Sequence, residues 1–326
     1  MIFGNNISNM REQLQILDNF PINFSTEAML SVNIVLAIVM YGVSLGIRPE
    51  MFKHLLIFPK AILIGLFTQA LILPALTFLL IILLNQWITP TIAMGMILVA
   101  ACPGGIFSSF LSQLSKANIE LSVGLTTIGT VITPLLTPFN FWLWGSLYIN
   151  FVNNYAGEAL QTLYIDYIQM FQTVLLLLGL PLFFGILTVK HFPKFAQKMR
   201  KPLRYFSIFF FIAMAIFAFN NNIDAFLNGV FVYIFILVFI HNSLILGSGL
   251  GLAKLFKLPE KDQRALTIEA GIQNSGLGLV LLFNPNIFPG ELSIGGMIHI
   301  TSWWWAWHII SGLSISFLWS RREPIN

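Results

Sequence analysis

The chain has 326 residues, of which 57% are apolar and only 9% are charged, a balance outside the range of soluble domains that predicts a membrane protein. The formal net charge is +4, and the basic residues lie in short loops between apolar runs, so this charge does not indicate nucleic-acid binding. A single cysteine, Cys102, excludes a disulfide within the chain and any multi-cysteine metal site.

Nine apolar segments follow one another along the chain, and we expect each to cross the membrane as a helix. A spanning helix needs about 20 mostly apolar residues, and the bilayer accepts only helices or closed barrels. Because these runs are continuous rather than alternating, they favour helices. The predicted fold is an all-α, polytopic membrane protein whose spans lie at 28–47, 61–85, 91–113, 119–147, 167–189, 205–220, 228–253, 265–284 and 293–319.

The loop charges predict the orientation. If residue 1 lies outside, 16 of the 17 Lys and Arg residues fall in cytoplasmic segments, at 48–60, 114–118, 190–204, 254–264 and 320–326. The expected location is the inner (plasma) membrane of the cell. By the positive-inside rule, the N-terminus then lies outside the cell and the C-terminus in the cytoplasm. Residues 1–27 lack the apolar core of a signal peptide and are expected to form an external segment, with 28–320 in the membrane and 321–326 as a cytoplasmic tail.

An inverted repeat is compatible with this topology. Pairing each span with the span five places later reverses its direction, as in transporters built from inverted repeats. Spans 5–9 then form a five-helix unit, and spans 1–4 form the same unit without its first helix.

The third and eighth spans, which correspond in this pairing, are both interrupted by polar and conformationally special residues. Proline removes a backbone donor and glycine permits non-helical torsions, so both helices are expected to unwind near the middle of the membrane. The third span carries Cys102, Pro103, Gly104 and Gly105, followed by Ser108 and Ser109, and the eighth carries Gly271, Gln273, Asn274, Ser275, Gly276 and Gly278.

Glu269 is the only acidic residue that we place well inside the bilayer. Its burial costs about 2.5–3.5 kcal/mol on insertion scales, and no Lys or Arg is predicted at the same depth. Either protonation or a bound cation must therefore compensate it. Gln273, one helical turn away, and Gln69 of the second span are nearby oxygen donors for a cation. The alternatives are a neutral acid hydrogen-bonded within the bundle and a Gln69 that serves helix packing.

Three hydroxyl residues spaced four apart, Ser122, Thr126 and Thr130, line one stripe at the start of the fourth span. Such hydroxyls commonly bond to carbonyls of their own helix, but three in register beside a broken helix indicate a polar site. The histidines lack metal-ligand spacing, and no nucleophile, base and orienting group come together. We therefore expect neither a transition-metal site nor an enzyme.

Several motifs together resemble the bile acid:sodium symporter family. They are Cys102-Pro103-Gly104-Gly105 with Ser108, Leu121-Ser122, Gln69 before Pro74, and the run Thr267-Ile268-Glu269-Ala270-Gly271-Ile272-Gln273-Asn274. The resemblance covers nearly the whole chain. It implies two inverted repeats divided into a panel domain (28–60 and 167–227) and a core domain (61–147 and 228–320), with two discontinuous helices crossing in the core.

The resemblance also implies the site residues. One sodium site would use Ser108, Ser109, Ser122, Thr126 and Glu269, and the other would use Gln69, Glu269, Gln273 and the backbone carbonyls of Ala270 and Ile272. Asn274, Ile106 and His308 would face the substrate. The chain departs from the family in having Ser109 where an asparagine is common, and Ile106 and Ile309 where polar residues are common.

The predicted function is sodium-coupled symport of an organic anion, bile acid-like or a small carboxylate, by alternating access. Sodium is the coupling ion, no cofactor is expected, and a monomer in the lipid bilayer is the working assembly. Proton-coupled transport, uncoupled transport and a channel remain as alternatives.

Overall fold

The structure is a computed structural model, and it describes residues 2–18, 26–47, 59–105, 107–155, 167–220, 229–284, 287–288 and 293–324. Within these ranges the regular elements are helices, and the one β-type pairing is an isolated bridge between two loops. The predicted all-α fold is confirmed, and its long apolar helices make the chain a polytopic membrane protein.

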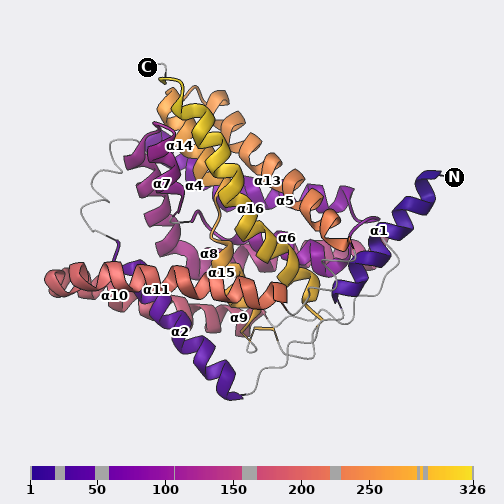
Figure 1. The fold of residues 1–326 in the computed structure, drawn as a ribbon, viewed down its shortest axis with the longest axis horizontal. Helices are drawn as coiled ribbons and strands as arrows, with labels where there is room; N and C mark the ends of the chain where they lie inside the picture. The colour runs from indigo at the N-terminus through magenta and orange to yellow at the C-terminus, as the bar shows by residue number, and fades with distance from the viewer. Residues whose placement is uncertain are drawn as a thin grey trace.

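Each predicted segment coincides with a helix or with consecutive helices (Figure 1). In chain order these are α2 (Thr26–Ser44); α4 (Pro59–Phe67), η2 (Thr68–Ile72) and α5 (Leu73–Leu83); α6 (Pro90–Ala101) and α7 (Phe107–Leu114); α8 (Ile119–Tyr155); α9 (Tyr167–Val174), η3 (Leu175–Gly179) and α10 (Leu180–His191); α11 (Pro193–Asn220); α13 (Val230–Leu255); α14 (Glu260–Gly271) and α15 (Ser275–Leu282); and α16 (Gly295–Ser320).

Four of these helical stretches are long and apolar enough to cross a membrane by themselves, counting only the residues that the structure describes. They are Pro59–Leu83, Ile119–Asn154, Ile168–His191 and Val230–Leu255. The total of nine spans, the inverted repeat and the orientation stay predictions.

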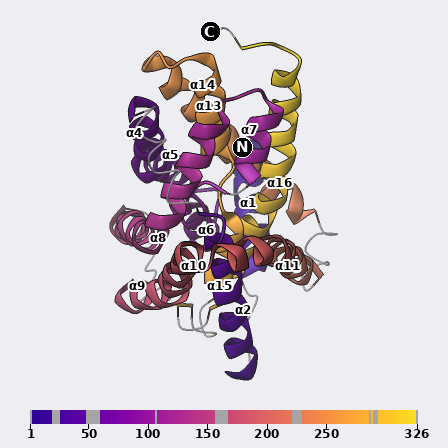
Figure 2. The same cartoon turned by 90° about the vertical axis from the view of Figure 1, so that its left-hand side faces the viewer.

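The helices form two groups in space. α2 packs against α10 and α11, which also contact each other, and both views place these helices with α9 at one end of the molecule (Figures 1 and 2). In the other group α13 packs on α14, and α16 packs on α6 and α15. α8 contacts both groups, since it touches α6, α7 and α14 as well as α9.

The largest apolar cluster lies around α6, α15 and α16. α6 is apolar all round and buried from Thr91 to Ala101, as a helix enclosed by protein must be. Its cluster includes Met94, Leu281 and the fully buried Trp304. Large apolar side chains elsewhere, such as Leu63, Leu83 and Phe183, are exposed on the outer helices, which suits a surface that faces lipid.

The predicted external segment contains a helix that the sequence analysis did not anticipate. α1 (Ile2–Asp18) packs against α13 and α16 and buries Leu14 and Leu17. Its last residue, Asp18, accepts hydrogen bonds from Thr91 and, at 3.2 Å, from Thr89 at the start of α6. Burial raises the pKa of the Asp18 carboxyl to about 6. α1 is amphipathic rather than uniformly apolar, so a search for spanning runs passes over it.

The basic stretch predicted as the loop 190–204 is helical, which corrects that expectation. α10 continues to His191, and α11 begins at Pro193 and runs on through the predicted sixth span. Proline is well accommodated at the first helical position, because the amide it lacks would have no partner there. Most of these basic residues therefore lie on α11, and the helix fixes the direction in which each side chain leaves the backbone.

Arg264 was also assigned to a cytoplasmic loop, but its side chain is only 1% exposed. Its Nη1 donates to the carbonyl oxygens of Ser115 at 2.9 Å, Trp319 at 3.2 Å and Arg322 at 3.1 Å, and its Nη2 donates to Glu260 at 2.7 Å. One guanidinium therefore joins the ends of α7, α14 and α16.

We expect Arg264→Met to lower the stability of the protein by at least about 2 kcal/mol, because several buried acceptors lose their donor. Thermal unfolding of the purified protein in detergent measures this as a lower midpoint. Lys261→Met, an exposed basic position on the same helix, is the matched control. Equal midpoints for the two variants would show that Arg264 does not hold these ends together.

Candidate functional site

Two broken helices build the centre of the molecule. α6 ends at Ala101 and α7 begins at Phe107, while α14 ends at Gly271 and α15 begins at Ser275. Both predicted interruptions are therefore confirmed. Cys102 already has extended torsions, because Pro103 disfavours a helical conformation of the residue before it.

The unwound segments cross and pair with each other. Gly104 and Gln273 form an antiparallel bridge, the Gly105 amide donates to the Ile272 carbonyl at 2.6 Å, and the Asn274 amide donates to the Pro103 carbonyl at 2.7 Å. Backbone groups released by two helix breaks thus satisfy one another where water is scarce. The crossing is consequently a specific junction rather than two independent gaps.

Two asparagines complete the junction. The Asn274 side chain caps α15 by accepting a hydrogen bond from the Leu277 amide at 3.2 Å. Asn242 of α13 donates its Nδ2 to the Gly271 carbonyl at 2.9 Å, which satisfies an acceptor at the end of α14. The sequence analysis missed Asn242, since a single amide within an apolar run carries no positional signal.

Glu269 lies beside this junction with 1% of its surface exposed. Its Oε2 accepts hydrogen bonds from Ser108 at 2.5 Å and Ser122 at 3.2 Å, and its Oε1 accepts one from Thr126 at 2.8 Å. Helices α7, α8 and α14 each contribute to this cluster. Within the described residues its partners are neutral, the three hydroxyls and the Gln69 amide, and none supplies a positive charge.

Two buried amides flank the carboxylate. Gln69 lies on η2, a π-helical segment before Pro74, and such segments are frequent at functional sites. Both amide atoms of Gln273 are buried without a hydrogen-bond partner among the described residues. Gly104 lies against this group, because a methyl group at Gly104 would be 2.8 Å from Glu269 Cδ and 2.9 Å from Gln69 Nε2.

The structure thus brings together most of the residues predicted for the two sodium sites. Ala270 and Ile272 lie at the end of α14, and the Ile272 carbonyl already accepts from Gly105. Ser109 is not among the hydrogen-bond partners of Glu269 and instead lines a cavity. Of the residues predicted to face substrate, His308 is buried in α16 with its Nδ1 bonded to the Trp304 carbonyl at 2.8 Å and is not among the residues that line this cavity. Ile106 lies outside the described residues.

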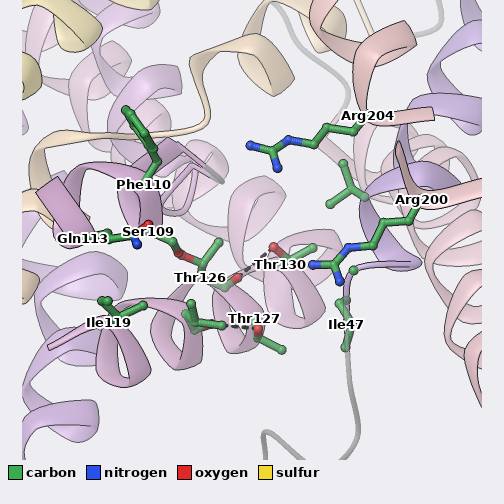
Figure 3. A pocket seen from close by; sticks show the side chains of 13 residues that line it. Ile47, Ser109, Phe110, Gln113, Ile119, Thr126, Thr127, Thr130, Arg200 and Arg204 are labelled. Atoms are coloured by element: carbon green, nitrogen blue, oxygen red, sulfur yellow. Dashed lines mark hydrogen bonds between the residues drawn. The ribbon is translucent and has the colours of Figure 1, made fainter. Parts of the chain in front are cut away.

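The cavity has a volume of about 340 Å³ and lies between α2 and α11 on one side and α7 and α8 on the other (Figure 3). Thr126 belongs to both its wall and the Glu269 cluster. Two arginines of α11 also line it, and these were missed because the sequence analysis treated them as loop charges. The lining residues are Val43, Gly46, Ile47, Ser109, Phe110, Gln113, Ile119, Val123, Thr126, Thr127, Thr130, Arg200 and Arg204.

Broken helices that cross inside a bundle are the arrangement in which secondary transporters hold their cargo, and this chain is a membrane transporter rather than an enzyme. It belongs to the Sodium Bile acid symporter family, whose sequence profile matches residues 33–228. The family resemblance noted from the motifs is therefore confirmed.

Three relatives illustrate the similarity. The "Uncharacterized sodium-dependent transporter YocS" of Bacillus subtilis (strain 168) is 30% identical over 291 residues, which are 89% of this chain and 83% of that protein. The "Probable sodium/metabolite cotransporter BASS2, chloroplastic" of Oryza sativa subsp. japonica is 30% identical over 76% of this chain and 55% of its own length. The human "P3 protein" is 28% identical over 72% of this chain and 46% of its own length. The chain spans about half the length of these last two relatives.

Proposed function

We propose that the protein is a sodium-coupled symporter of an organic anion. The observation that carries the proposal is Glu269, a buried carboxylate whose described partners are all neutral. A buried charge requires compensation, and a cation bound among these oxygen atoms supplies it. The names of the relatives, which include a sodium-dependent transporter and a sodium/metabolite cotransporter, support sodium as that cation.

Two sodium sites share Glu269 in this proposal. The first uses the hydroxyls of Ser108, Ser122 and Thr126, with Ser109 as a further ligand implied by the family resemblance. The second uses the side-chain oxygens of Gln69 and Gln273 with the carbonyls of Ala270 and Ile272. The unpartnered Oε1 of Gln273 supports it, since a buried acceptor without a hydrogen bond is costly unless something binds it. Carboxylate, hydroxyl and carbonyl oxygens are hard donors that suit such an ion.

Transport proceeds by alternating access around the crossing. α2 and α9–α11 form the panel domain and the remaining spans form the core domain, with the cavity between them supporting this division. Sodium bound at Glu269 ties α7, α8 and α14 together, and the movement of the panel against the core exposes the site to either side. In this proposal the protein spans the plasma membrane with its N-terminus outside the cell and its C-terminus in the cytoplasm.

The electrical balance follows from the number of ions. Two sodium ions with one monovalent anion move one net charge, which yields about 2.3 kcal/mol at 100 mV. This alone supports more than about tenfold accumulation of the anion. One sodium ion with the same anion is electroneutral and gains nothing from the potential.

The test is uptake of radiolabelled carboxylates and a bile acid into proteoliposomes. We expect an inward sodium gradient to drive saturable uptake, and an inside-negative potential to increase it if two ions are coupled. Uptake driven by a pH gradient in sodium-free buffer would show that the coupling ion is the proton rather than sodium. Flux that does not saturate would instead indicate a channel.

A further inference from the structure

Two arginines one helical turn apart face the cavity from α11. Figure 3 shows the side chains of Arg200 and Arg204 extending from the panel-side helix toward the opposite wall, which α7 and α8 form. They are the charged residues among those that line the cavity in the described part of the chain, where they supply two positive charges and no lining residue is acidic. Guanidinium groups are the donors that suit carboxylates, sulfonates and phosphates, through bidentate hydrogen bonds.

The opposite wall has complementary chemistry. The hydroxyl hydrogens of its threonines are already used, because Thr126 donates to Glu269 at 2.8 Å, Thr127 to the Val123 carbonyl at 2.7 Å and Thr130 to the Thr126 carbonyl at 2.8 Å. The oxygens of Thr127 and Thr130 are therefore left as acceptors on this wall, whereas the Thr126 oxygen also lies 3.1 Å from the Ser108 hydroxyl. Donors with positive charge thus face a wall of neutral acceptors across the same space.

We propose that Arg200 and Arg204 form a two-arginine clamp that binds the anionic group of the transported solute, while a hydroxyl of the same solute donates to the threonine wall. This inference rests on the proposed function and names the ligand more closely, as a hydroxylated organic anion. A cavity of about 340 Å³ is at the lower end of the range for ligand sites, which runs from about 300 to 1,000 Å³, and so favours a small ligand.

The position of Thr126 connects the clamp to the ion site. Thr126 touches the Glu269 carboxylate and also lines the cavity, so an anion held by the arginines lies one side chain away from the proposed sodium ions. Opposite charges at this separation attract in a medium of low dielectric constant. Each then increases the affinity for the other, and the clamp is the element of this coupling on the panel side.

Arg200 also has a structural alternative, since its Nε lies 3.8 Å from the position of a methyl group built at Gly46, beyond the end of α2. Cationic groups at a helix C-terminus are stabilising. Arg204 is therefore the more informative position, and Arg204→Gln is the primary variant.

The experiment measures binding to purified protein in neutral detergent by isothermal titration calorimetry. The probes are pantoate, a small hydroxy acid, and cholate, each with its neutral amide as a control, in sodium chloride and in choline chloride. For at least one anion we expect Arg204→Gln to weaken binding about tenfold or more, since a hydrogen bond to a charged group is lost. Arg204→Lys should retain part of the affinity, and binding of the amides should not change.

Lys198→Gln, an exposed basic position of α11 outside the cavity lining, is the matched control and should bind like the wild type. Wild-type binding that is equally tight in sodium chloride and in choline chloride, and that is lost in Arg204→Gln, would keep the clamp and overturn sodium coupling. Sodium-dependent binding of undiminished affinity in Arg204→Gln would overturn the clamp and leave coupling intact. Failure of both anions to bind the wild-type protein would also overturn the clamp.

The phosphate of a lipid could use the same donors, so the titrations are repeated in nanodiscs of phosphatidylcholine alone and with phosphatidylglycerol. A clamp for the solute predicts the same effect of Arg204→Gln in both. If anion binding is indifferent to the variant, and only stabilisation by phosphatidylglycerol is lost, the arginines form a lipid site and the proposal is wrong.

Discussion

Glu269→Gln is expected to abolish sodium-driven uptake. The amide keeps the size of the carboxylate, its oxygen can accept from Thr126, and its NH2 group can donate to the Ser108 hydroxyl oxygen, so the fold should persist. It removes the negative charge from a site that is 1% exposed. Because the loss of one partner of a buried, hydrogen-bonded charge pair costs about 2–5 kcal/mol, the apparent Kd for sodium should rise by about 30-fold or more.

Proteoliposome uptake at graded sodium concentrations, together with sodium-induced changes in tryptophan fluorescence, checks this prediction. Glu120→Gln, an exposed acidic position in the first turn of α8, is the control and should retain sodium dependence. If Glu269→Gln takes up the anion with unchanged sodium dependence, the carboxylate does not bind the coupling ion.

Gly104→Ala is expected to reduce transport at least tenfold without unfolding the protein. The added methyl group would lie 2.8 Å from Glu269 Cδ and 2.9 Å from Gln69 Nε2, closer than side chains normally approach, so one of these groups must move. Overpacking of this kind costs about 1–3 kcal/mol, and here the strain falls on the ligands of both proposed sodium sites.

Gly251→Ala is a suitable control for that variant, because a methyl group at this exposed position of α13 would have nothing within 4 Å. Circular dichroism should show equal helix content for the two variants, and sodium titration should show a weaker response only for Gly104→Ala. Normal sodium affinity and uptake in Gly104→Ala would mean that the close approach of backbone and carboxylate has no part in ion binding.

The main features of the site could be predicted from the sequence because each has a strong local cause. Proline and glycine interrupt a helix wherever they occur in it, so the breaks near Pro103 and Gly271 needed no knowledge of neighbouring helices. A carboxylate in an apolar run, as at Glu269, is costly in any arrangement and therefore indicates a site. The positions of the helices along the chain could be predicted from the positions and lengths of the apolar runs.

The faces of the helices could not be predicted in the same way. Ser108 and Ser109 are neighbours and chemically identical, yet Ser108 donates to Glu269 and Ser109 lines the cavity. Consecutive residues point about 100° apart on a helix, and the rotation of α7 is set by its packing after the break rather than by its composition. The burial of α1 against α13 and α16 is likewise a tertiary effect.

By itself, the sequence determined an all-α membrane protein with two interrupted helices and a buried acid, because apolar length, proline, glycine and charge act locally. Only the tertiary structure decided what those features meet. Packing pairs Gly104 with Gln273 and places three hydroxyls around Glu269. It also buries Arg264 and directs the side chains of Arg200 and Arg204 toward a cavity. These contacts join residues far apart in the chain, and such contacts depend on how whole helices pack rather than on the residues beside them.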